Sequence, residues 1–120
     1  VSATAATGTI NYDTNTQSVV YYTSAAVGDW TINFRASSGA TLNSVIATGE
    51  AITLVHLVTL TGAEYRNTVV QVDGSSITPE WQGGSAPTTG NANSIDSYAY
   101  TIIKTGDAAF TILAALTQFA

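Results

Sequence analysis

The chain of 120 residues has the length of one domain, and it is long enough to bury a core of its own. It contains no cysteine, which excludes disulfides and thiolate metal sites, and only 9% of its residues are charged. Three cations against eight carboxylates exclude nucleic-acid binding, and no apolar run is long enough for membrane insertion.

Alternation of apolar and polar residues predicts β-strands along most of the chain. In the sequence DWTINFR, the side chains of Trp30, Ile32 and Phe34 fall on one face and predict a strand that faces the core. The strands predicted in this part of the chain are Gly8–Tyr12, Ser18–Thr23 and Asp29–Arg35.

One short helical turn is predicted near residues 42–48. Leu42, Val45 and Ile46 are spaced as on one face of a helix, and Gly49 follows as a residue suited to end it.

The sequence AITLVHLVTL, from Ala51 to Leu60, is apolar on both faces, which is typical of a central strand covered on both sides. A strand over Thr68–Val72 is followed by Asp73-Gly74, a pair that predicts a tight hairpin into a strand over Ser76–Trp81.

The last two predicted strands, Ser97–Lys104 and Ala109–Phe119, are joined by a turn at residues 105–107. Many short strands with Gly-rich turns between them predict an all-β fold, an antiparallel β-sandwich or jelly roll. We expect one domain over residues 1–120, in which strands of residues 1–24 are the least clearly marked. The chain begins with Val1, so we expect a processed chain or a domain of a longer protein.

His56 is the only imidazole of the chain, and it shares a strand face with Leu54 and Val58. No nucleophile motif accompanies it, so we predict a histidine in the core or at a subunit interface. If three copies met at that face, their imidazoles would form a pH-sensitive ring, because histidine titrates near neutrality.

The carboxylates are scattered, and most of them lie beside Gly or Asn at predicted turns. No calcium-loop or phosphate-binding pattern is present, and we expect no enzyme activity, no metal and no cofactor. A hydrolase would need two opposed carboxylates, for which Glu80 and Asp96 are the candidates.

Aromatic and amide side chains around the segment PEWQGGSAPTTGNANSID form a candidate glycan or receptor site. Each has a structural alternative: Trp81 would anchor the long loop to the sheet, and the asparagines would form local turns. The candidate contact residues are Trp81, Gln82, Tyr65, Tyr98, Asn91 and Asn93.

Several sequence blocks occur in a fixed order that resembles the carboxy-terminal β-sandwich domain of tailed-phage virion structural or tail-fibre proteins, notably of marine phages and cyanophages. The resemblance covers roughly residues 25 to 120. Its blocks are N-F-R at Asn33–Arg35, L-N-S at Leu42–Ser44, A-T-G at Ala47–Gly49, D-G-S at Asp73–Ser75 and W-Q-G-G…G-N-A-N-S-I-D at Trp81–Asp96.

The resemblance implies a non-enzymatic structural protein of a virion, a homotrimeric knob, fibre tip or capsid decoration that contacts sister copies and other virion proteins. The alternative is a receptor- or carbohydrate-binding module that recognises the host surface. The scarcity of charge favours burial in an assembly over a secreted module with a Thr-rich surface. We expect Gly83, Gly84 and Gly90 at the subunit boundary, because small uncharged residues let backbones approach closely. His56, on its apolar strand face, is the fourth candidate for that boundary.

Overall fold

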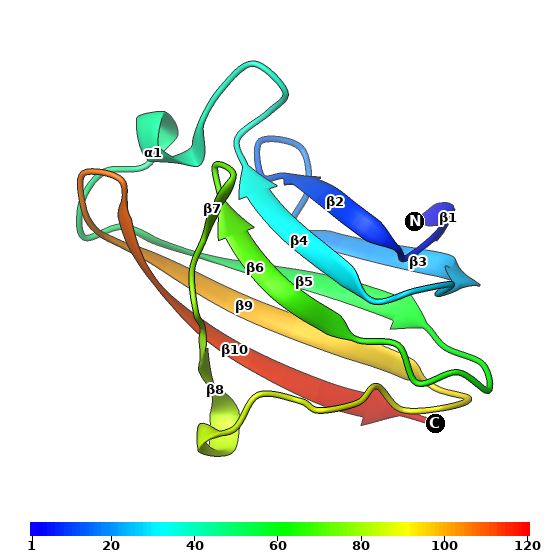
Figure 1. The fold of residues 1–120 in the computed structure, drawn as a ribbon. Helices are drawn as coiled ribbons and strands as arrows, with labels where there is room; N and C mark the ends of the chain where they lie inside the picture. Colours follow the sequence, from blue (N-terminus) through cyan, green and yellow to red (C-terminus); the bar gives the residue numbers. More distant parts are fainter.

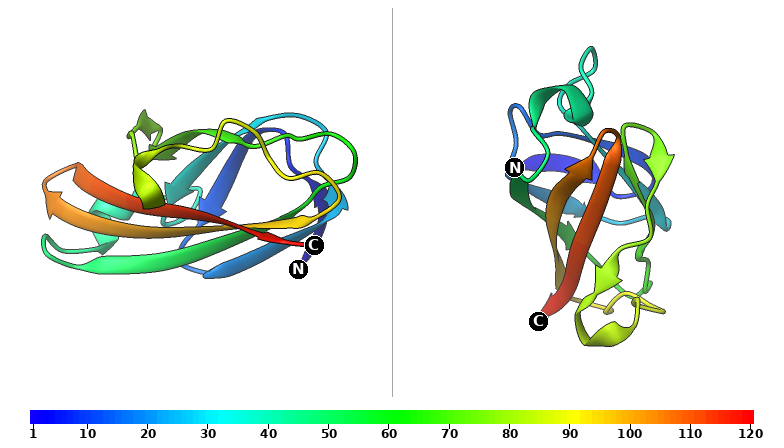
Figure 2. Two further views of the ribbon diagram at one scale, coloured as in Figure 1. Left: turned by 90° about the horizontal axis from the view of Figure 1, so that it is seen from below. Right: turned by 90° about the vertical axis from the view of Figure 1, so that its left-hand side faces the viewer.

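The computed structural model describes all 120 residues as two β-sheets packed face to face (Figures 1 and 2). Sheet A has six strands in the order β1-β3-β5-β9-β10-β8, and sheet B has four in the order β2-β4-β6-β7. An all-β sandwich is therefore confirmed. The strands are β1 (Ser2–Ala5), β2 (Gly8–Asp13), β3 (Val19–Ala25), β4 (Trp30–Arg35), β5 (Ala51–Thr59), β6 (Asn67–Val72), β7 (Ser75–Ser76), β8 (Glu80–Trp81), β9 (Ile95–Gly106) and β10 (Ala109–Phe119).

The first six strands alternate between the two sheets, so the chain winds as a flattened coil. Strands that are two apart in sequence become neighbours and run parallel: β1, β3 and β5 in sheet A, and β2, β4 and β6 in sheet B. The prediction of an antiparallel sandwich or jelly roll is wrong for this half. Apolar alternation marks a strand but carries no information on its direction, so the sequence pattern did not distinguish the two arrangements.

Antiparallel pairing between strands involves only β5, β6, β7, β9 and β10. β9 pairs with β5 and with β10, and β7 pairs with β6 through the predicted turn, where Asp73 and Gly74 have φ of 51° and 81°. The strand predicted over Ser76–Trp81 is wrong, because β7 ends at Ser76. The chain then crosses to sheet A, where β8 runs parallel to β10.

The helix α1 (Leu42–Val45) lies where one helical turn was predicted. The Thr41 side chain accepts a hydrogen bond from the Ser44 amide, which caps the amino-terminal end of this helix. Four residues are too few for an independent helix, so the rest of the chain holds α1 in place.

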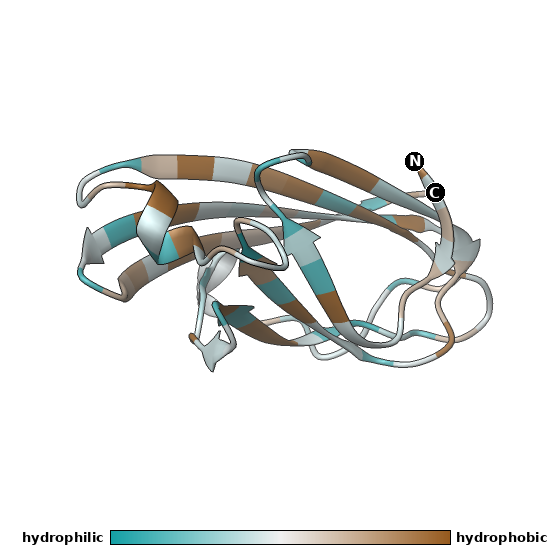
Figure 3. Cartoon of the chain, turned by 90° about the horizontal axis from the view of Figure 1, so that it is seen from above, coloured by the Kyte–Doolittle hydropathy of each residue, from teal (hydrophilic) through white to brown (hydrophobic).

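The core lies between the inner faces of the two sheets, and hydrophobic residues alternate with polar ones along the strands (Figure 3). The predicted inward residues Trp30, Ile32 and Phe34 are buried. From sheet A, the rings of Tyr98 and Tyr100 pack against them, at centroid distances of 5.5 Å from Trp30 and 5.1 Å from Phe34 respectively. The sandwich thus has an aromatic core.

The two sides of the sandwich end differently. On one side β1 and β2 are the outermost strands of their sheets, and their outer edges are unpaired. On the other side the outermost strands are β7 and β8, which have two residues each. The longer loop of residues 82–94 follows β8 and lies along the same side (Figure 1).

Candidate functional site

A groove with a volume of about 400 Å³ lies between β8, the loop that follows it and the end of β10. No charged side chain lines it, and its amides and hydroxyls provide donors and acceptors beside an indole ring. Such a set of groups can hydrogen-bond a polyhydroxylated ligand and stack on its apolar face. The lining residues are Trp81, Gln82, Ser85, Pro87, Thr89, Asn91, Leu116 and Gln118.

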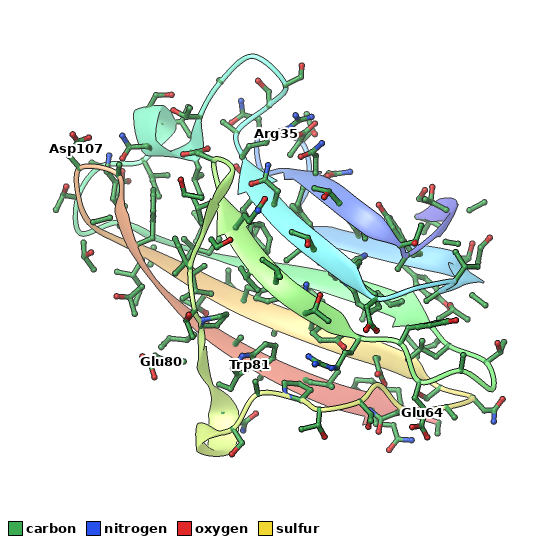
Figure 4. All side chains as sticks on the ribbon, viewed as in Figure 1. Arg35, Glu64, Glu80, Trp81 and Asp107 are labelled. Atoms are coloured by element: carbon green, nitrogen blue, oxygen red, sulfur yellow. The ribbon has the colours of Figure 1, made fainter.

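The indole of Trp81 is positioned by pairing of β8 with β10, where Trp81 lies opposite Ala114. Its ring is half-buried and packs edge-on against Tyr98 with a centroid distance of 6.5 Å. Glu80 and Trp81 point to opposite sides of β8, and Trp81 points toward β9 and β10 (Figure 4). Trp81 therefore anchors the loop to the sheet, which was the structural alternative to a ligand contact. It also lines the groove.

The loop of residues 82–94 is closed by the carboxylate of Asp96, which has no solvent exposure. Both the backbone amide and the side-chain amide of Asn91 donate to Asp96 at 3.0 Å, and the Ser94 hydroxyl donates to it at 3.0 Å. Three donors satisfy a buried carboxylate. Asn91 thus lines the groove because Asp96 holds it there.

The same loop packs closely on the connection between β5 and β6. Gly90 is buried, and a Cβ atom placed on it would lie only 2.0 Å from the carbonyl oxygen of Tyr65. The Gly90 amide donates to the carbonyl of Glu64 at 2.9 Å. Gly90 therefore lets the loop approach its own chain, and its prediction as a subunit contact is wrong. Gly83 and Gly84 are exposed in a 3₁₀ turn with φ of 80° and 83°.

Of the six candidate contact residues, the groove brings together Trp81, Gln82 and Asn91. Tyr98 is fully buried between the sheets, so its prediction as a ligand contact is wrong; its hydroxyl accepts a hydrogen bond from the amide of Asn67. Tyr65 and Asn93 do not line the groove.

The sequence did not point to the β10 residues of the groove. Leu116 and Gln118 lie far from the loop in sequence and reach it because β10 pairs with β9, where Gln118 lies opposite Asp96, and with β8. The predicted pairing of the last two strands places the end of Ala109–Phe119 near the loop. The predicted partner of the Ser76–Trp81 segment was a different strand, so Trp81 itself was not linked to these residues.

The carboxylates of Glu80 and Asp96 are not opposed to one another. Glu80 is exposed beside Leu113, on the outer side of sheet A, whereas Asp96 is buried on the inner side. This pair therefore does not flank a common cleft, as a hydrolase with these two residues would require.

His56 lies in the core, with no solvent exposure, between the rings of Tyr22 and Trp30 at centroid distances of 4.7 and 6.0 Å. Neither ring nitrogen has a hydrogen-bond partner, and burial lowers the pKa of His56 to about 4. The prediction of His56 at a subunit interface is wrong, and so is the three-copy ring, because the surrounding sheets separate this imidazole from any other chain.

No three His, Asp or Glu side chains lie close enough together to hold a metal ion. The chain also has no helix of the length and apolarity that crossing a bilayer demands.

The fold and the groove together define a two-sheet β-sandwich with an uncharged surface hollow at one side. Comparison of the chain with protein-family models, with curated proteins and with solved structures finds no match. The resemblance to tailed-phage virion domains therefore remains a prediction.

Proposed function

We propose that the chain is a non-enzymatic structural module of a virion that associates with copies of itself. The resemblance in sequence to tailed-phage proteins gives the virion context, in which the module is a knob, a fibre tip or a capsid decoration. Its partners are then sister copies and other proteins of an extracellular particle.

The observation that carries this proposal is that charged residues are few and that most of them hydrogen-bond within their own chain. Arg35 donates to Asp13 at 2.6 Å, and Lys104 donates to the carbonyls of Asn43 and Ile46. Six of the eight carboxylates accept hydrogen bonds from their own chain, and Glu64 and Glu80 are the remaining two. Monomeric proteins usually rely on free, mixed charges for solubility, so a surface this poor in them favours burial in an assembly.

Light scattering of the purified chain at micromolar concentration tests self-association. We expect a mass that is a multiple of the 12.4 kDa of one chain. We also expect that mass to persist at high salt, because contacts between uncharged surfaces are not screened. A stable monomer under these conditions would contradict the proposal.

The second candidate function is recognition of a carbohydrate on the host surface through the groove beside β8. It is favoured by one observation, which is that Trp81, Gln82 and Asn91 lie around the same uncharged hollow. The amide of Gln118 adds a further donor and acceptor from β10. Aromatic stacking together with amide hydrogen bonds suits a neutral sugar better than an ionic ligand.

A glycan array with matched glutamine variants tests this second function. Gln82→Ala and Gln118→Ala change exposed amides of the groove, and each is expected to weaken binding about tenfold through loss of hydrogen bonds. Gln71→Ala, on β6 in the other sheet, is the control and is expected to bind as the unchanged chain does. Equal binding by all three variants would contradict a sugar site in the groove.

A further inference from the structure

The outer face of sheet A, formed by the side chains of β3, β5, β9 and β10 that point away from sheet B, carries no charged and no amide side chain. Strand alternation assigns every second residue to it, and all of them are Val, Leu, Ile, Ala, Thr, Ser, Tyr or Phe. One row across the sheet is Val19, Val55, Ala99 and Ala115. The apolar second face predicted for residues 51–60 is part of this surface.

Several large apolar side chains of this face are in contact with water in the single chain. Val19 is 59% exposed, Leu113 is 47% exposed and Phe119 is 58% exposed. Glu80 of β8, beside Leu113, is the charged residue at the rim of this face. Large apolar side chains that gather exposed on one uncharged face are typical of a protein–protein interface.

The outer face of sheet B has the opposite character. Asn11 and Asn33 lie side by side and hydrogen-bond at 3.0 Å, and Asp13 and Arg35 form an ion pair in the next row. These groups are well solvated in water and would be costly to bury. The difference between the two outer faces shows that sheet A is the side suited to a partner.

The size of the face meets the requirement of a stable interface. Four strands spaced about 4.8 Å apart, each with about nine residues rising 3.3 Å, give a flat area of roughly 600 Å². Two such faces therefore bury at least roughly 1,200 Å², which is the lower end of the range for specific complexes.

The hydroxyl groups of the face are already partly satisfied within the chain. Thr53 and Thr101 hydrogen-bond each other at 3.3 Å across β5 and β9, and Thr59 donates to the carbonyl of Tyr22 at 2.9 Å. These two bonds lower the cost of removing water from Thr53, Thr59 and Thr101.

We propose that the outer face of sheet A packs against the same face of a second copy of this chain. A surface without charge offers nothing to pair with an acidic, basic or amide-rich partner, but it matches an equally uncharged one. Ala99 and Ala115 lie near its middle, and their small side chains allow two sheets to approach to about 10 Å. Two identical faces pair about a two-fold axis, which gives a dimer instead of the three-fold ring that the phage resemblance implies.

This proposal rests on the proposed self-association. Lysine variants distinguish a failure of the assigned face from a failure of self-association. Ala99→Lys, in the middle of the face, and Val19→Lys, at an exposed position, are tested by sedimentation equilibrium. Val69→Lys on β6 of sheet B is the matched control, because Val69 is also an exposed strand valine. Circular dichroism checks that each variant keeps the β fold.

We expect the unchanged chain and Val69→Lys to have twice the 12.4 kDa mass of one chain. Both sheet A variants are expected to raise the dimer dissociation constant at least roughly a hundredfold, because each would bury an unpaired charge. If the oligomer survives both changes, the assigned face is wrong but self-association stands. A three-fold oligomer of the unchanged chain would have the same consequence. A monomeric unchanged chain overturns the proposed function itself.

Discussion

His56 and Trp30 are buried polar rings whose nitrogens make no hydrogen bond in the core. They lie edge-on to one another at a centroid distance of 6.0 Å, and Tyr22 is also edge-on to His56, at a centroid distance of 4.7 Å. The cost of these unsatisfied groups is offset by packing in an aromatic core. Because protonation would place an unpaired charge there, the neutral imidazole is the form compatible with the fold.

His56 is expected to make the stability of the fold depend on pH. The pKa of His56 is about 4 in the folded chain and 6.5 when the side chain is not buried. As the pH falls, the unfolded chain therefore takes up the proton before the folded chain does. The contribution of neutral His56 is complete above pH 6.5 and is lost as the pH falls from there toward 4, by roughly 3 kcal/mol in the free energy of unfolding.

Urea unfolding of the unchanged chain and of His56→Phe over this pH range measures that effect. His56→Phe keeps a ring of similar shape without a titrating group, and its stability is expected to fall less between pH 6.5 and 4. The carboxylates contribute equally to both proteins. Parallel pH profiles would show that His56 does not titrate in the way its burial implies.

At the scale of the elements, α1 depends on contacts from distant strands. The carboxylate of Asp73 accepts hydrogen bonds from the amides of Leu42 and Asn43 at 2.7 and 3.0 Å, at the start of the helix. At its other end, the ammonium group of Lys104 donates to the carbonyls of Asn43 and Ile46 at 2.7 and 2.9 Å. Opposite charges at the two ends complement the dipole of the backbone.

Lys104→Met is expected to lower the free energy of unfolding by about 2 kcal/mol, because two carbonyls lose a charged donor. The amides of residues 42–46 should then exchange with solvent faster, which hydrogen exchange measures together with the unfolding midpoint. Arg66→Met is the control, since its guanidinium makes one side-chain hydrogen bond at 3.4 Å, and its effect should stay within about 0.5 kcal/mol. Equal losses in the two variants would contradict the role given to Lys104.

Strand positions were predictable from sequence where alternation was long, and pairing was predictable where a turn fixed it. DWTINFR marked β4, and Asp73-Gly74 marked the hairpin between β6 and β7. β1, with the sequence SATA, was missed because it has no large apolar residue to set an alternation. The parallel pairs depend on crossings between the sheets, which leave no residue signature as specific as a two-residue turn.

On the scale of the whole molecule, the chain forms a sandwich of 41 × 31 × 19 Å whose two outer faces differ. The face of sheet B is polar, and the face of sheet A, for which we propose contact with a second copy, is uncharged. Half of the candidate contact residues converge at one groove, but only the folded chain shows that Tyr98 is buried and that Gln118 joins the site. Such placements follow from the pairing of β8 and the burial of Asp96, which a linear pattern does not contain.

The two ends of the coiled arrangement give this molecule a direction in which it can be lengthened. The free edges of β1 and β2 carry no lysine or proline, and they can accept a further pair of parallel strands, one on each sheet. At the opposite edges the two-residue strands β7 and β8 end the sheets. A designer who wished to enlarge this scaffold would therefore graft a duplicate of the segment from β3 to β4 ahead of β1, leaving the closing hairpin untouched.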